Sequence, residues 1–227
     1  MLGEERITTY CGLDCAKCDY KEKYNCGGCV ATKGNPFHGK CELASCTISK
    51  GKRFCGECEK FPCELLNKFS FDKEQGDNGV RIENCKKLKN EFVKEGREGL
   101  NPVCYCGLNC DFCFLGQWCG GCRSDYNCCS FATLFEDKKC PNATCCNEKK
   151  IKGCWECDEL KSCNKGFFKN DNAFTMKAYC LLIKKYGEQV YSETIKNAVA
   201  NGVDYAKDFD ALGSTEKVLE ALEKYRK

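Results

Sequence analysis

Apolar residues recur at helical spacing in the middle of the chain and again near its end. In the middle, the apolar positions of residues 81–95 fall three or four residues apart, at Ile82, Cys85, Leu88 and Phe92. This spacing predicts an amphipathic helix, and Gly96 is a typical stop. Lysines occupy the intervening positions, which fits a solvated face.

Three further helices are predicted towards the end. Residues 173–186 space Phe174, Ala178 and Leu182 for packing, residues 188–200 continue the pattern, and residues 215–225 follow Ser214 as a helix cap. A shorter helix is expected at residues 61–66, where proline suits the first turn. The tail after Cys163 is therefore expected to be a helical cap.

Outside these helices the pattern is set by cysteine, of which the 227 residues contain 26. Ten cysteine positions occur twice with nearly the same spacing. The first set is Cys11, Cys15, Cys18, Cys26, Cys29, Cys41, Cys46, Cys55, Cys58 and Cys63. The second set is Cys106, Cys110, Cys113, Cys119, Cys122, Cys140, Cys145, Cys154, Cys157 and Cys163. An internal repeat of this kind predicts two modules.

We place the boundary between the modules near residue 100, with a first cysteine-rich module at residues 1–100 and a second at residues 101–227. Because cysteine contributes much of the 42% hydrophobic content, the apolar core of each module is expected to be thin. A thin core needs additional cross-links, which metal ions or disulfides can provide. We expect an α+β fold built from small metal-stapled, zinc-knuckle-like modules with flanking helices.

Charge and hydropathy exclude several classes of partner. The formal charge of +3 comes from 36 basic and 33 acidic residues that are mixed along the chain, so no basic patch for nucleic acid is expected. No apolar run is long enough for a membrane span, and the first residues do not resemble a signal peptide. We expect a cytoplasmic protein. Because that compartment is reducing, the cysteines favour metal binding over disulfides.

Local sequence around the cysteines suits metal binding. Asp14 and Asn109 precede helix-compatible stretches as N-caps would, which places Cys15 and Cys18 one turn apart. In the two Cys-Gly-Gly-Cys segments, glycine allows the backbone to curl and to direct NH groups towards sulfur. Three CxxC units in each copy make the signal specific.

Zinc is the favoured metal, because separated CxxC pairs are a usual form of structural zinc site. Ten thiolates make either two four-thiolate sites with two sulfurs left over or a bridged cluster of three metals, and the spacing does not decide between them. An iron–sulfur cluster is the alternative, since thiolates hold those clusters too. Cys11, Cys15 and Cys18 also have the spacing of a radical S-adenosylmethionine loop, but seven further cysteines crowd into the space that such an enzyme's barrel would need.

Six cysteines lie outside the shared set, namely Cys85, Cys104, Cys128, Cys129, Cys146 and Cys180. Cys85 and Cys180 are expected to be buried on helices as small hydrophobes. Cys128, Cys129 and Cys146 lie among the ligand loops, where an extra or exchanged ligand is as plausible as none. The single histidine, His38, has Asp137 as its counterpart, so a site present in both copies does not depend on it.

The residues from Cys11 to Cys63 read CGLDCxxC, then CxGC, Cx4C, CGEC and FPC. This order resembles an uncharacterised family of cysteine-rich domains presumed to bind zinc, and residues 106–163 form a degenerate second match. The second match has Asn109 for the aspartate and Lys161-Ser162 before Cys163. Residues 178–188 also resemble a segment that follows the cysteine core in some members. The resemblance implies a metal-binding domain and no particular activity.

Closed thiolate sites leave no open position for a substrate, and there is no phosphate loop or evident catalytic constellation. The sequence therefore favours a binding or scaffolding role, with another protein as partner, over catalysis. The competing class is an iron–sulfur electron carrier or a redox or metal-handling protein.

Overall fold

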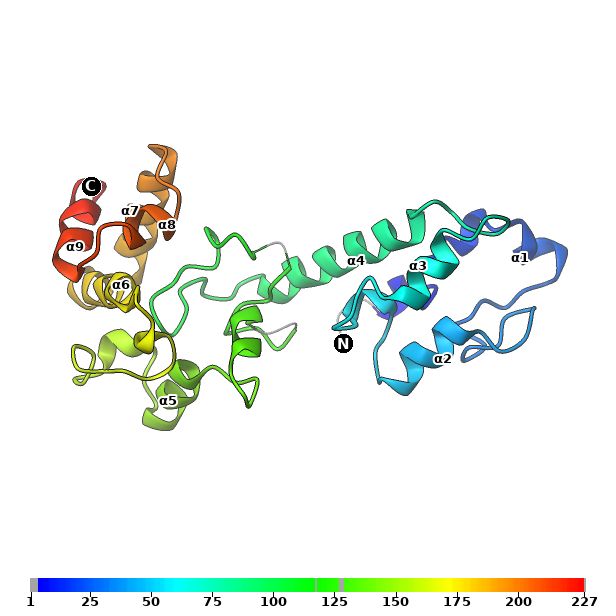
Figure 1. The fold of residues 1–227 in the computed structure, drawn as a ribbon, viewed down its shortest axis with the longest axis horizontal. Helices are drawn as coiled ribbons and strands as arrows, with labels where there is room; N and C mark the ends of the chain where they lie inside the picture. Colours follow the sequence, from blue (N-terminus) through cyan, green and yellow to red (C-terminus); the bar gives the residue numbers. More distant parts are fainter. Residues whose placement is uncertain (1–3, 117, 127–128, 227) are drawn as a thin grey trace. The chain divides into compact units, whose positions relative to one another are not determined.

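A computed structural model describes residues 4–116, 118–126 and 129–226 of the chain. These residues form two compact units, Met1–Glu95 (unit 1) and Gly96–Lys227 (unit 2). Figure 1 shows the order of their elements along the chain. No helix among the described residues is long and apolar enough to cross a membrane.

The expected α+β fold is wrong, because the protein is helical. Helices account for 49% of the structure and strands for 1%, and the described residues contain no sheet. Val103 and Asn109 form an isolated antiparallel bridge that does not extend into a strand pair. The physical reason is that the loops between cysteines curl into turns, and their NH groups bond to nearby carbonyls and sulfur instead of to a neighbouring strand.

Unit 1 consists of short helical segments and one long helix (Figure 1). Its 3-10 turns are η1 (Glu4–Arg6), η2 (Cys15–Lys17) and η3 (Cys55–Glu57), and its α-helices are α1 (Asp19–Lys23), α2 (Glu42–Ser49), α3 (Glu64–Ser70) and α4 (Val80–Arg97), whose last two residues belong to unit 2. The buried apolar side chains are few. Phe54 and Phe92 meet edge to face at 6.0 Å between ring centroids, and Leu43 and Leu66 are fully buried.

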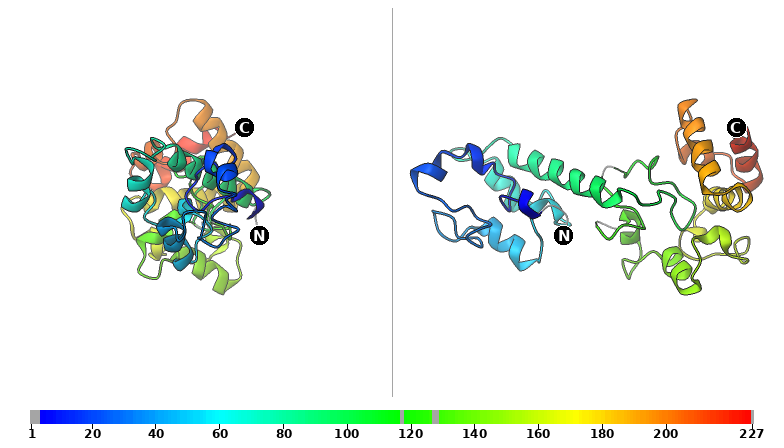
Figure 2. Two further views of the ribbon diagram at one scale, coloured as in Figure 1. Left: turned by 90° about the vertical axis from the view of Figure 1, so that its right-hand side faces the viewer. Right: turned by 180° about the vertical axis from the view of Figure 1, so that it is seen from behind.

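Unit 2 has the same kind of cysteine-rich loops and a larger helical part. Its 3-10 turns are η4 (Ser130–Leu134), η5 (Cys154–Glu156) and η6 (Gly166–Lys169), and its α-helices are α5 (Pro141–Lys149), α6 (Ala173–Tyr186), α7 (Glu188–Ala200), α8 (Lys207–Asp210) and α9 (Thr215–Glu223). Helices α6 to α9 lie together in both views of Figure 2, with α6 packed against α7 and α9.

The core of unit 2 joins this helical part to the cysteine loops. Tyr179, Tyr191 and Val218 have no exposed surface, and they belong to one buried cluster that also contains Cys106 and Trp155. Burial of such large side chains contributes about 1.5–3 kcal/mol each. The expected helical cap of the second module is therefore a core element of unit 2.

The helices predicted from apolar spacing are confirmed. Helix α4 covers the expected residues 81–95, and α6 and α7 have the expected bounds. Helix α9 ends at Glu223, two residues early, after the predicted Ser214 cap, which accepts a bond from the Lys217 NH. Gly96 does not stop α4, which continues to Arg97. The short helix begins at Glu64 with Cys63 as its cap, so Pro62 precedes the helix instead of entering it.

Candidate metal centres

Every cysteine that the structure describes is a free thiol. Three CxxC segments form single 3-10 turns, in which the NH of the second cysteine bonds to the carbonyl of the first: Cys18 to Cys15 at 3.5 Å, Cys58 to Cys55 at 3.0 Å and Cys157 to Cys154 at 3.1 Å. Side chains three residues apart are eclipsed in a 3-10 turn. Each turn therefore presents two sulfurs on one side.

The predicted cap is present in unit 1, where Asp14 precedes the turn Cys15–Lys17, whereas among the described residues no helix begins directly after Asn109, which closes only a local turn. The predicted glycine turns are present in both units. The Asp14 carboxylate accepts from the Ala16 NH at 3.0 Å, and the Asn109 amide oxygen accepts from the Asp111 NH at the same distance. Gly28 and Gly121 have positive φ angles of 79° and 82°. Their NH groups donate to Cys26 Sγ at 3.5 Å and to Cys119 Sγ at 3.4 Å.

Four cysteines of unit 1 line one small cavity, and we call them its C-terminal thiol group: Cys46, Cys55, Cys58 and Cys63. The cavity has a volume of about 20 Å³, which is too small for an organic substrate. Thr47 Oγ1 lies 3.3 Å from Cys55 Sγ, and Lys50 Nζ lies 3.8 Å from Cys58 Sγ. Burial, with smaller contributions from the charges of Cys11, Cys63 and Cys46, raises the pKa of the Cys55 thiol to about 12, and the hydrogen bond from Thr47 acts in the opposite direction.

Five cysteines of unit 2 line a cavity of the same volume, about 20 Å³: Cys145, Cys146, Cys154, Cys157 and Cys163. These form the C-terminal thiol group of unit 2. Cys146 stands where unit 1 has Thr47, and its sulfur lies 3.6 Å from Cys154 Sγ. Lys149 stands where unit 1 has Lys50 and reaches Cys157 Sγ at 3.4 Å. The two groups thus share a cation and a hydrogen-bonding side chain at matching places.

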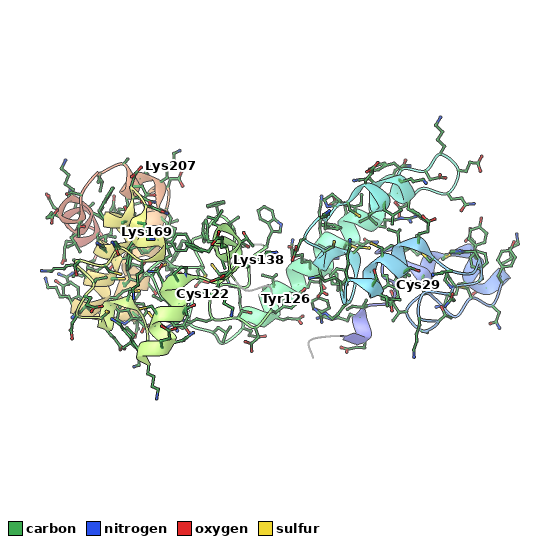
Figure 3. The ribbon with its side chains drawn as sticks, turned by 60° about the horizontal axis from the view of Figure 1, so that its bottom comes forward. Cys29, Cys122, Tyr126, Lys138, Lys169 and Lys207 are labelled. Carbon is green, nitrogen blue, oxygen red and sulfur yellow. The ribbon has the colours of Figure 1, made fainter. Side chains whose placement is uncertain are left out.

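The other six shared cysteines of unit 1 form its N-terminal thiol group: Cys11, Cys15, Cys18, Cys26, Cys29 and Cys41. Burial, with smaller contributions from the charges of Cys11, Cys15 and Cys41, raises the pKa of Cys29 to about 11. The pKa of Cys15 is raised by burial and then by Cys18, Cys11 and Cys26. Each sulfur thus lies close enough to others of the group to repel their charges. The Tyr10 NH donates to Cys29 Sγ at 3.4 Å (Cys29 is labelled in Figure 3).

Eight cysteines line one cavity of about 40 Å³ in unit 2, and we call them its N-terminal thiol group: Cys104, Cys106, Cys110, Cys113, Cys119, Cys122, Cys129 and Cys140. Six are the shared positions, including Cys122, which is labelled in Figure 3. Hydrogen bonds to Cys110 and Cys122 raise the pKa of Cys104, while the hydrogen bond from Cys129 lowers the pKa of Cys119. Sulfurs of this group thus lie within hydrogen-bonding distance of one another, as Cys104 Sγ and Cys110 Sγ do at 3.3 Å.

Two guanidinium groups lie beside the N-terminal thiol group of unit 2. The charge of Arg97 lowers the pKa of Cys110, after the larger effect of the Cys104 thiol. The charge of Arg123 acts in the same direction on Cys122, again after Cys104. Arg97 donates to the Gly116 carbonyl at 2.9 Å, and Arg123 donates to the Val103 carbonyl at 2.8 Å. Both cations are thus fixed in place.

Cys85 and Cys180 are fully buried on α4 and α6, as the sequence predicts. Each of them packs against the glycine that follows the first shared cysteine. A Cβ on Gly12 would lie 2.7 Å from Cys85 Sγ, and a Cβ on Gly107 would lie 3.0 Å from Cys180 Sγ. These two cysteines are therefore counterparts too, and each lies 73 residues after its glycine.

Sequence reasoning missed the polar neighbours of the sulfurs. Lys50 and Lys149 each lie eight residues before the cysteine that they contact. The same spacing separates Thr47 and Cys146 from their cysteines. One turn of helix and the following loop bring each pair together. The lysine at the same distance before a cysteine in both copies was the sequence signal that could have revealed these contacts.

Among the described residues, no three or more His, Cys, Asp or Glu side chains stand in an arrangement ready to hold a metal ion. The thiols gather around small cavities at contact distances such as the 3.3 Å between Cys104 and Cys110. His38 packs edge-on against Phe37 at 5.2 Å between ring centroids. Cys128, for which a ligand role was left open, lies outside the described residues.

The two tryptophans of the chain lie next to thiol groups of unit 2. Trp155, between Cys154 and Cys157, is 4% exposed and belongs to the core, whereas Trp118, next to Cys119, is 49% exposed.

A family described as "Protein of unknown function (DUF3795)" matches residues 7–68. That stretch contains both thiol groups of unit 1, and the match supports the resemblance to an uncharacterised family drawn from Cys11–Cys63. Searches of curated proteins and of solved structures found no match.

Proposed function

We propose that this chain is a zinc-binding protein in which thiolates of each unit hold structural metal, and that its role is binding or scaffolding within a reducing compartment such as the cytoplasm. The observation that carries the proposal is the gathering of shared cysteines around small cavities, four of them around one cavity in unit 1 and all ten around two cavities in unit 2. Thiolates in this number are a donor set that suits zinc.

The sorting also suggests how the metal is shared out. Four thiolates complete one tetrahedral zinc ion, so the C-terminal thiol group of unit 1 suits a single ion. Six thiolates suffice for two such ions if two sulfurs bridge. Unit 1 would therefore hold three zinc ions with all ten of its shared cysteines.

The lysines support this assignment. A zinc ion held by four thiolates carries a net charge of −2, and an ammonium group beside it offsets part of that charge. Lys50 and Lys149 each point to a sulfur of a C-terminal thiol group. Hydrogen bonding to sulfur raises the pKa of Lys50, so the cation is retained at neutral pH.

Elemental analysis of anaerobically purified protein tests the proposal. We expect zinc in stoichiometric amount, no visible absorption, and partial loss of zinc in Cys15→Ser, a variant of an N-terminal thiol group. Brown protein with stoichiometric iron and acid-labile sulfide would establish the iron–sulfur alternative instead. Protein that takes up neither metal would contradict both.

A scaffolding role needs a surface for a partner, and unit 1 exposes a stack of three aromatic rings. Tyr20, Tyr24 and Phe37 are each more than 40% exposed, and their ring centroids lie 4.8–5.7 Å apart. Aromatic side chains are enriched at protein interfaces. Tyr24→Ser with Phe37→Ser should abolish cross-linking of unit 1 to its protein partner and leave the zinc content unchanged. Unchanged cross-linking would exclude this surface.

A further inference from the structure

The N-terminal thiol group of unit 2 contains two sulfurs that unit 1 lacks. Cys104 occupies the position of Thr9, two residues before the first shared cysteine. Cys129 lies in an insertion, because six more residues separate Cys122 from Cys140 than separate Cys29 from Cys41. Both extra sulfurs line the same cavity as the six shared cysteines.

The side chain at the position of Thr9 and Cys104 makes different contacts in the two units. Thr9 Oγ1 donates to the Leu13 carbonyl at 2.9 Å and accepts from the Gly12 NH at 3.1 Å, so this hydroxyl serves the backbone of its own loop. In unit 2 the same loop is closed by backbone groups, with the Cys104 NH bonded to the Leu108 carbonyl at 2.7 Å. Cys104 Sγ lies 3.3 Å from Cys110 Sγ instead. The substitution therefore adds a sulfur to the group without opening the loop.

The backbone at Cys129 and Ser130 is bonded to the group. The Cys129 NH donates to the Gly121 carbonyl at 3.2 Å, and the Ser130 NH donates to Cys119 Sγ at 3.1 Å. These two bonds fix the backbone on either side of the Cys129 side chain. An inserted loop that only bridged two elements would not need to return to the Cys-Gly-Gly-Cys turn.

Charge around the group is consistent with additional thiolates. Two more thiolates add two negative charges, and the Arg123 guanidinium is fixed beside the sulfurs by bonds to the Val103 and Lys152 carbonyls. Arg97 is held nearby, where it is also paired with the Asp111 carboxylate at 2.8 Å. The counterpart of Arg123 in unit 1 is Val30, directly after the Cys-Gly-Gly-Cys turn. Unit 2 thus has a cation where unit 1 has an apolar side chain.

We propose that Cys104 and Cys129 are metal ligands, so that the N-terminal thiol group of unit 2 holds two divalent ions of the zinc class with eight thiolates. Each ion then has four sulfurs of its own, whereas the two ions of unit 1 must share two bridging sulfurs. This inference rests on the proposed function. Its consequence is that unit 2 retains its metal at chelator concentrations that strip the N-terminal thiol group of unit 1.

The test uses the full chain loaded with zinc under anaerobic, reducing conditions and titrated with EDTA. Alkylation followed by peptide mass spectrometry reports when Cys106–Cys122 become reactive, and native mass spectrometry counts the ions that remain. The double variant Cys104→Thr with Cys129→Ser should release this metal at no more than a tenth of the EDTA concentration that the wild type needs. Cys146→Thr is the matched control, since it also gives unit 2 a unit 1 residue, and it should leave protection of Cys106–Cys122 unchanged.

The outcomes separate the two proposals. If the wild type holds zinc and the double variant needs as much EDTA as the wild type, the two extra cysteines are not ligands, while the zinc proposal stands. If the wild type holds no zinc, both proposals fail. Hydrogen exchange in α6 and α7 shows whether the double variant is folded. If it is not, Cys104→Thr alone must still release metal at lower EDTA than the wild type, and equal retention overturns the inference.

Discussion

Unit 1 and unit 2 support the same ligand loop by different means. In unit 1 the Gly12 carbonyl accepts a bond from the Asn84 side chain of α4 at 2.9 Å. In unit 2 the Gly107 carbonyl accepts from the buried Tyr191 hydroxyl of α7 at 2.6 Å, and the Asn109 NH donates to Tyr205 at 2.8 Å. The loop of unit 2 thus rests on an apolar helical core, whereas unit 1 has a thin core. The difference indicates that unit 1 depends more on its sulfurs for stability.

Metal removal should give the largest difference between the units. Chelation under reducing conditions should unfold unit 1, including α2 and α3, because binding free energy of a structural zinc site is folding free energy. Helices α6, α7 and α9 of unit 2 should persist, because they bury Tyr179, Tyr191 and Val218 against one another. Circular dichroism combined with segment-resolved hydrogen exchange measures both. Full protection of α2 without metal would contradict the dependence of unit 1 on its thiol groups.

An alanine at the glycine after the first shared cysteine should destabilise unit 1 more than unit 2. A Cβ at Gly12 would lie 2.2 Å from the Arg81 carbonyl oxygen, whereas a Cβ at Gly107 would come no closer than 3.0 Å to its neighbours. Both glycines have positive φ, which costs about 1–2 kcal/mol for alanine, and overpacking adds about 1–3 kcal/mol. We expect about 3–4 kcal/mol for Gly12→Ala and about 2 kcal/mol for Gly107→Ala in denaturant unfolding.

Gly51→Ala is the control for the glycine pair, because Gly51 has a φ of 61° and open space around it. It should show only the conformational cost of about 1–2 kcal/mol. Equal losses for Gly12→Ala and Gly51→Ala would mean that the contact with α4 is not tight.

Removing the hydrogen bond to the loop carbonyl should destabilise unit 2 more than unit 1. Tyr191→Phe leaves the Gly107 carbonyl unsatisfied in a buried place and should cost about 1–3 kcal/mol. Asn84→Ala removes a bond at a half-buried place, where water replaces the amide, and should cost about 0.5–1.5 kcal/mol. Denaturant midpoints of the zinc-loaded variants measure the two values. An equal or larger loss for Asn84→Ala would contradict this order.

The smallest effect is expected at the lysines. Lys149→Gln and Lys50→Gln each remove a cation beside a C-terminal thiol group, and zinc affinity should fall by about two- to fivefold. Lys149 Nζ lies closer to sulfur, at 3.4 Å against 3.8 Å for Lys50, but it is also paired with the Glu159 carboxylate at 2.7 Å, so the two changes should be of similar size. Competition with a chromophoric chelator measures the affinities. Arg variants at both positions keep the charge and should behave like the wild type.

The helices were predictable because apolar spacing determines them locally. Helices α6 and α7 have the expected bounds, and the Asp14 cap makes the expected bond. The α+β fold was not supported by any alternating segment, and the cysteine loops satisfy their backbone groups within turns. Expecting strands from the likeness to zinc knuckles was the error.

The sorting of sulfurs could not be obtained from spacing. Cys41 and Cys46 are five residues apart, yet Cys41 belongs to the N-terminal group and Cys46 to the C-terminal group. The start of α2 separates them, because Cys41 caps the helix and Cys46 lies within it. Cys104 and Cys146 were visible only as unmatched cysteines. The fold places Cys104 Sγ 3.3 Å from Cys110 Sγ and Cys146 Sγ 3.6 Å from Cys154 Sγ.

The positions of Trp118 and Trp155 make the intrinsic fluorescence of the chain a report on unit 2 alone. Unit 1 contains no tryptophan, so its thiol groups are silent at indole wavelengths. Trp155 is shielded beside the C-terminal group and should emit towards the blue, while the half-exposed Trp118 beside the N-terminal group should emit towards the red. The emission band of unlabelled protein thus separates events at two neighbouring centres by colour.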